Sequence, residues 1–177
     1  LERAGLGGEA VHLDAVLALA TGDDPSARID VPGGGVRRQY DLLVFSPGRG
    51  PDPGPPAPME LVEGNCRWGS WSVTCIQAVC PEKAYVSPRE FYLRPGRYLI
   101  RPRREGDALI LGRRPEKTVK KLMIDEKLPA GRRNRVPILD RDGRAAAAGG
   151  FGPDKRHLAE PGTPALHIIL KTEENEL

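Results

Sequence analysis

The sequence lacks any apolar segment long enough to cross a membrane. No apolar run approaches the roughly 18 residues that a spanning helix needs, and the N-terminus has no basic stretch followed by an apolar one of the kind that directs secretion. Hydrophobic residues make up 39% of the chain and charged residues 29%, which is typical of a globular protein that buries a core. We therefore expect a cytoplasmic protein with no membrane partner.

Cysteine and histidine are scarce, and their positions match no metal site. The spacings of Cys66, Cys75 and Cys80 fit no zinc pattern, and no histidine lies near them, so we expect reduced, partly buried structural thiols. No Ser/His/Asp or Cys/His order supplies a catalytic nucleophile, because each of the three histidines stands alone. The sequence predicts no metal, no cofactor and no catalytic residue in this part of the protein.

Glycine and proline are plentiful, with 21 and 18 residues among 177, and they predict many turns and few long helices. Six prolines and three glycines fall in residues 46–58, which we expect to form a surface loop or linker. Alternating apolar and polar residues predict short strands at 27–31, 35–46, 59–64, 66–80, 90–102, 108–111, 136–140, 144–150 and 165–170. The run 59–64 is expected to form a hairpin with 66–80 by turning at Gly64-Asn65.

Two segments have the spacing of an amphipathic helix, residues 9–20 and residues 118–127. At 100° per residue, the second helix has an apolar side and a basic side. The apolar side holds Val119, Leu122 and Met123, and Lys117, Lys120 and Lys121 lie opposite. This helix is therefore expected to pack on a core while it presents lysines to solvent.

We predict an α+β fold, built mostly of short antiparallel strands with one or two helices. The chain begins at Leu1 without methionine and enters a helix at once, so we expect a piece of a longer protein. The expected parts are a helical remnant of a preceding domain (1–23), a β-rich connecting region (24–82), a C-terminal domain (83–172) and a frayed tail (173–177).

Positive charge is concentrated between Arg101 and Arg135, which holds twelve basic and five acidic residues. The whole chain has 27 basic and 24 acidic residues, so the remainder has 15 and 19 and is net acidic. A run of charge is often only a solvated surface. Here it is local and rich in arginine, whose planar donors suit phosphate, so it favours a polyanion such as nucleic acid.

The same stretch resembles a known family. The ordered motifs IRPRREGD (100–107) and KTVKKLMIDEKLPAGRRNRVPIL (117–139), followed by the glycine pair at 149–150, are similar to the C-terminal domain of the bacterial tRNA(Ile)-lysidine synthetases. Upstream, RIDVPGGGVRRQYDLLVF (28–45) resembles the segment that joins that domain to the family's middle helical domain. Residues 48–86 match poorly.

The resemblance implies a role in tRNA modification. Members of the family are ligases that join lysine to the wobble cytidine of isoleucine tRNA. They use ATP with Mg, and the ATP binds to an N-terminal PP-loop domain. No PP-loop motif occurs in this sequence. The fragment by itself is therefore expected to be non-catalytic and free of cofactors, with the missing catalytic domain and tRNA as its partners.

The family's C-terminal domain is a three-layer fold with a β-sandwich, shared with phenylalanyl-tRNA synthetase, and it grips the acceptor stem of the tRNA. By this resemblance, the expected tRNA-binding residues are Arg101, Arg103, Arg104, Lys117, Lys120, Lys121, Arg132, Arg133 and Arg135. Asp107 and Asp125 are expected to orient these cations or to cap turns. The alternative is a protein-interaction or structural module whose basic surface meets an acidic partner without nucleic acid.

Overall fold

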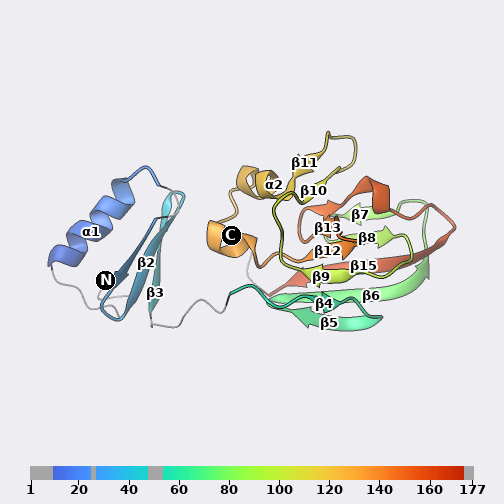
Figure 1. The fold of residues 1–177 in the computed structure, drawn as a ribbon, viewed down its shortest axis with the longest axis horizontal. Coiled ribbons are helices and arrows are strands. Elements are labelled where there is room, and N and C mark those ends of the chain that lie inside the picture. The colour runs from blue at the N-terminus through green and yellow to red at the C-terminus, as the bar shows by residue number, and fades with distance from the viewer. Residues whose placement is uncertain (1–9, 25–26, 48–53, 174–177) are drawn as a thin grey trace. The chain divides into compact units, whose positions relative to one another are not determined.

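The computed structural model describes residues 10–24, 27–47 and 54–173, and it divides the chain into two compact units, Leu1–Pro53 and Gly54–Leu177 (Figure 1). Part of the predicted loop at 46–58 and nearly all of the predicted tail lie outside the described residues. Among the described residues, no helix is long and apolar enough to cross a membrane.

The first unit packs one helix on a small sheet. The helix is α1 (Ala10–Thr21), and the sheet has the antiparallel order β1 (Arg28–Val31), β2 (Gly34–Gln39), β3 (Leu42–Pro47). Its core residues are Val16, Leu19, Val31 and Val36. Helix α1 and strand β1 confirm the helix predicted at 9–20 and the strand predicted at 27–31. The run 35–46 is two strands instead of one, because Tyr40 adopts a φ of 54° and reverses the chain.

The second unit is built on two five-stranded antiparallel sheets. The first sheet has the order β14 (Gly152–Pro153), β13 (Arg144–Ala148), β12 (Ile138–Arg141), β9 (Leu99–Arg101), β4 (Met59–Glu60). The second has the order β5 (Gly64–Trp68), β6 (Trp71–Val79), β15 (Pro164–Thr172), β8 (Glu90–Leu93), β7 (Tyr85–Ser87). We call them the middle sheet and the outer sheet. Apolar side chains of both sheets form one core, which includes Trp68, Trp71, Phe91, Ile100, Leu139 and Ile168.

A third layer covers the other face of the middle sheet. It consists of the hairpin β10 (Ala108–Leu109) and β11 (Lys117–Thr118), and the helices α2 (Val119–Asp125) and α3 (Ala130–Arg133). Figure 1 shows α2, β10 and β11 across β12 and β13 from β6 and β15. A second core joins these layers, with Leu109, Val119, Leu122 and Met123 against Val136, Ile138, Ala145 and Ala148. The structure thus confirms the α+β class and the predicted helix, whose apolar side is buried as expected.

Residues 54–82 belong to the C-terminal unit, so the division that we expected after residue 82 lies instead at residues 53 and 54. The reason is long-range pairing, because β6 pairs with β15 along nine residues, from Pro164 opposite Val79 to Thr172 opposite Trp71. The hairpin before it also turns later than expected. Trp68 and Trp71 are paired across Gly69, which has a φ of 59°, and Gly64 is the first residue of β5.

The cysteines behave as predicted. All three are free thiols, Cys75 and Cys80 are buried, and Cys66 is half-buried. Burial raises the pKa of Cys75 to about 11, with a smaller contribution from the negative charge of Glu63. Burial also raises the pKa of Cys66 and of Cys80. Because the reactive form of a cysteine is the thiolate, these are structural and not reactive thiols.

Candidate nucleic-acid interface

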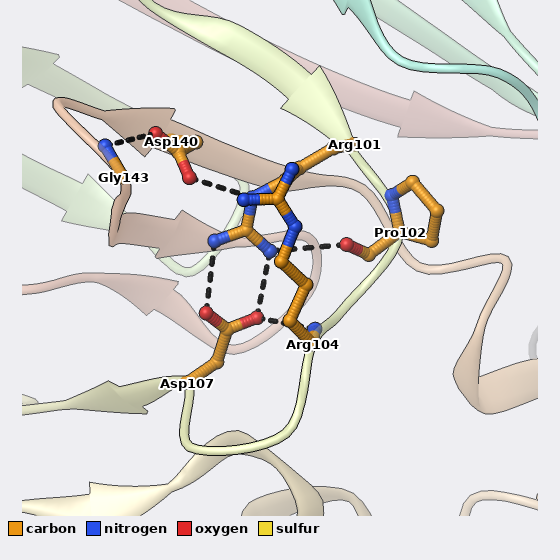
Figure 2. Close-up of polar contacts among 6 residues, drawn as sticks. All are labelled: Arg101, Pro102, Arg104, Asp107, Asp140 and Gly143. Atoms are coloured by element: carbon orange, nitrogen blue, oxygen red, sulfur yellow. Dashed lines mark hydrogen bonds and ion pairs between the residues drawn. The ribbon is translucent and has the colours of Figure 1, made fainter.

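A buried ion-pair network anchors the basic segment to the middle sheet (Figure 2). Arg101, the last residue of β9, is fully buried. Its Nη1 and Nη2 donate to the two carboxylate oxygens of Asp107 at 2.7 and 2.8 Å, and its Nε donates to Asp140 Oδ2 at 2.6 Å. Burial opposes the charge of Arg101, but its hydrogen bonds with both carboxylates outweigh burial and raise its pKa. The guanidinium is therefore permanently charged and satisfied inside the protein.

The two carboxylates each fix a turn of the backbone as well. Asp107 Oδ2 accepts a hydrogen bond from the backbone N of Arg104 at 2.6 Å, and Asp140 Oδ1 accepts one from the backbone N of Gly143 at 2.8 Å. Arg101 Nη1 also donates to the carbonyl of Pro102 at 3.0 Å. Loop 102–106 is thus held at both ends, as Figure 2 shows. This confirms the prediction that Asp107 orients a cation and a turn.

Arg101 must be removed from the predicted tRNA-binding residues. Its side chain is 1% exposed, and its donors are already engaged by Asp107, Asp140 and a backbone carbonyl. No phosphate can reach it without unfolding the site. Its role is to support the loop that carries Arg103 and Arg104. Arg104 is exposed, while Arg103 is half-buried, with a buried Nε that has no hydrogen-bond partner.

Helix α2 presents lysines next to this loop. The carbonyl of Asp107 accepts a hydrogen bond from the backbone N of Val119 at 2.8 Å, so the end of the clamped loop lies against the start of the helix. Thr118 caps the helix by accepting from the backbone N of Lys121. Lys120 and Lys121 are exposed, whereas Lys117 is half-buried and pairs with Asp125, as predicted for that aspartate.

The arginines at 132–135 lie partly on a short helix, since α3 includes Arg132 and Arg133. Arg133 Nε donates to the carbonyl of Leu128 at 2.9 Å, which ties α3 to the end of α2. All three arginines, including Arg135, are half-buried. The clamped loop, α2 and α3 are therefore neighbouring parts of one surface, which we call the basic surface.

Three exposed cations of the stretch 101–135 were not among the predicted site residues, and we include them in the basic surface. Arg113 and Arg114 lie between β10 and β11, and Lys127 follows α2. Arg113 and Arg114 fall between the two family motifs, whereas Lys127 lies inside the motif 117–139 and was not singled out there. The signal that could have identified Arg113 and Arg114 is the turn glycine Gly112, with a φ of 57°, which places its neighbours at the tip of a hairpin.

Asp154 attaches the β10–β11 hairpin to the rest of the unit. It is fully buried and accepts from the backbone N of Ile110 at 2.9 Å and from Arg156 Nη2 at 2.7 Å. Arg156 also donates to Glu116 Oε1 at 2.9 Å. Burial of Asp154 acts to raise its pKa, but the hydrogen bonds from Arg156 and the backbone N of Ile110 outweigh it and lower the pKa. The carboxylate is therefore held ionised.

The basic surface keeps its excess charge after these pairings. The stretch from Arg101 to Arg135 has twelve basic and five acidic residues, and the pairs Arg101–Asp107 and Lys117–Asp125 each combine one of either sign, so its net charge stays positive. Of the other acidic residues in this stretch, Glu116 is itself paired with Arg156. Among the described residues, no group of histidine, cysteine, aspartate or glutamate is suited to hold a metal ion.

The fold is that of a known domain class. The chain is similar to a solved structure described as "Crystal structure of TILS C-terminal domain", with a TM-score of 0.58 and 19% sequence identity over 67% of this chain and 100% of that chain. No curated protein matches the chain.

A family match identifies the domain more closely. Residues 99–170 match the family described as "TilS substrate C-terminal domain". The matched stretch contains the clamped loop, α2 and α3 together with β9, β12, β13 and most of β15. The resemblance to the C-terminal domain of tRNA(Ile)-lysidine synthetases is thereby confirmed.

We predict that Arg101→Met destabilises the fold by about 3–5 kcal/mol, because it leaves two buried carboxylates without their cation. The measurement is urea unfolding followed by tryptophan fluorescence. The triple variant Arg101→Met/Asp107→Asn/Asp140→Asn removes the orphaned charges and should be more stable than the single variant. A triple variant less stable than Arg101→Met would contradict the electrostatic explanation.

We predict that Asp154→Asn destabilises the fold at pH 7 by about 1–3 kcal/mol and that this difference shrinks in acid. The pKa of Asp154 is lower in the folded state than the ordinary value of about 3.9. Its ionised form therefore stabilises the fold fully above about pH 4, and this contribution is lost as the pH falls through the folded pKa. Urea unfolding at pH 7, 5, 4 and 3 tests this, with exposed Asp142→Asn as the control. A difference that is equal at pH 7 and pH 3 would refute the prediction.

Proposed function

We propose that the basic surface is the tRNA-binding face of the substrate domain of a tRNA(Ile)-lysidine synthetase. The observation that carries the proposal is that a clamped loop, a lysine face and an arginine helix are linked to one another by hydrogen bonds within the stretch that matches this family. The protein as a whole would be the ligase, with ATP and Mg bound in an N-terminal catalytic domain that this sequence does not contain.

The geometry suits a double-stranded RNA stem, and we propose the acceptor stem of isoleucine tRNA. An A-form stem presents phosphates and 2′-hydroxyls across a wide, shallow minor groove, so shape and backbone charge dominate recognition. The proposed contacts are now Arg103, Arg104, Lys120 and Lys121, the arginines Arg132, Arg133 and Arg135, and the added Arg113 and Arg114. Lys117 is a weaker candidate because Asp125 already pairs with it.

We predict that Lys120→Ala and Lys121→Ala each weaken binding to all tRNAs alike. Loss of one phosphate contact should lower the slope of log affinity against log salt concentration by about 1. Filter binding at several salt concentrations measures both effects. The control is Lys171→Ala, an exposed lysine on β15 in the outer sheet.

Two results would count against this proposal. Binding of the wild-type chain without a salt slope would exclude phosphate contacts. A polyglutamate chain that binds as tightly as tRNA of equal charge would favour an acidic protein partner.

We predict that the arginines of α3 and its C-terminal flank influence the choice between tRNAs more than bulk affinity. A planar guanidinium can donate two hydrogen bonds to a base edge, which is worth about 1–3 kcal/mol of discrimination. Alanine variants of Arg132, Arg133 and Arg135 should therefore lose more affinity for isoleucine tRNA than for a non-cognate tRNA, measured in competition. Equal losses on both tRNAs would assign these residues to the phosphate backbone.

A further inference from the structure

Lys127 adopts a backbone conformation that is unfavourable for lysine. Its φ is 54°, in the left-handed region, where a Cβ clashes with the backbone and glycine is preferred. Two other described residues besides glycine share this feature, Tyr40 and Asp142, and both lie in two-residue turns of β-hairpins. Such turns require positive φ values. Lys127 lies instead at the end of a helix.

The backbone around Lys127 forms a Schellman motif that closes α2. The backbone N of Leu128 donates to the carbonyl of Met123 at 2.8 Å, and that of Lys127 donates to the carbonyl of Ile124 at 2.9 Å. Leu128 also packs against the second core, to which Met123 belongs, as expected from the apolar contact that accompanies this motif. The position of Lys127 is the one that glycine most often occupies.

The chain uses glycine readily where it needs this conformation. Ten described glycines have a positive φ, including Gly106 and Gly112 on either side of β10. Position 127 therefore differs from these positions, because lysine and not glycine has the positive φ there. A left-handed residue other than glycine persists where the surrounding structure holds it, and such residues cluster at functional sites.

The contacts of the Lys127 side chain give no reason for lysine in place of glycine. The side chain is exposed and has no hydrogen bond or ion pair with any described residue, and the nearby Asp125 pairs with Lys117. A cation near the C-terminus of a helix gains something from the helix dipole, but that effect is screened at an exposed site. The hydrogen bonds of the motif would form equally with glycine, so the extra cost of lysine over glycine is not recovered by contacts of its side chain.

The position joins the two basic elements of the surface. Lys127 follows the lysine face of α2, and its neighbour Leu128 accepts the hydrogen bond from Arg133 of α3. A cation at this position lies between the basic residues of α2 and those of α3. Because the Schellman hydrogen bonds fix its backbone, it is also held in place before any ligand arrives.

We propose that Lys127 is a phosphate contact of the tRNA-binding face, kept in a strained backbone conformation for binding and not for folding. This inference rests on the function proposed above. It predicts opposite effects of one substitution, since Lys127→Gly relieves the strain and removes the charge. Stability should increase while affinity for tRNA decreases.

Three variants of the full chain separate charge from strain. Lys127→Gly should raise the melting temperature by about 2–4 °C and lower the salt slope of tRNA binding by about 1. Lys127→Ala should lose the same affinity without gaining stability, because alanine keeps the Cβ. Lys127→Arg should keep both properties near those of the wild type. Lys120→Ala, measured in parallel, reports on the basic surface itself.

The outcomes are distinguishable. Loss of affinity in Lys127→Gly and Lys127→Ala, with a rise in melting temperature for glycine alone, supports the inference. If Lys120→Ala weakens binding and both uncharged Lys127 variants bind like the wild type, the inference is wrong while the proposed function stands. If Lys127→Gly does not raise the melting temperature, no strain is stored there and the inference also fails. If the wild-type chain shows no salt-dependent tRNA binding, the proposed function fails and the inference fails with it.

Discussion

The buried pairing of Arg101 with Asp107 and Asp140 is the interaction on which the arrangement of the basic surface depends. An isolated buried charge would cost far more than the fold can supply, so the guanidinium requires both carboxylates. Each carboxylate in turn accepts from a backbone N–H of a turn, Arg104 in one case and Gly143 in the other. One cation thereby fixes the loop before β10 and the β12–β13 hairpin together.

The need for this network follows from the three-layer architecture. In the middle sheet both faces are covered, so neighbouring residues of β9 enter different cores. Ile100 pairs with Leu139 and packs between the sheets, while Arg101 pairs with Ile138 and faces the layer that contains α2. In a sheet with one solvated face, that side chain would have reached water. Here it is buried, and its partners must come from the protein.

The local sequence pattern was enough to predict several helices and strands, but it did not predict which charged side chains are buried. The α2 helix, the 138–148 hairpin and the strand around His167 follow from periodicity and turn residues, and all three occur. The burial of Arg101 depends on β9 lying between two layers, which is set by pairing with β12 and β4 far away in sequence. For the same reason, the sequence pattern placed residues 54–82 in a connecting region and not in the C-terminal unit. The β6–β15 pairing that places them there joins residues far apart in the sequence.

The basic surface depends on the core more than on its own helices. A helix of seven residues such as α2 is too short to be stable alone, so its lysines are positioned by the burial of Val119, Leu122 and Met123. Cations held by a folded core lose less freedom when they meet a ligand than cations on a mobile segment do. In this domain, the buried ion pairs and the second core therefore contribute to binding indirectly, by fixing where the exposed charges lie before contact is made.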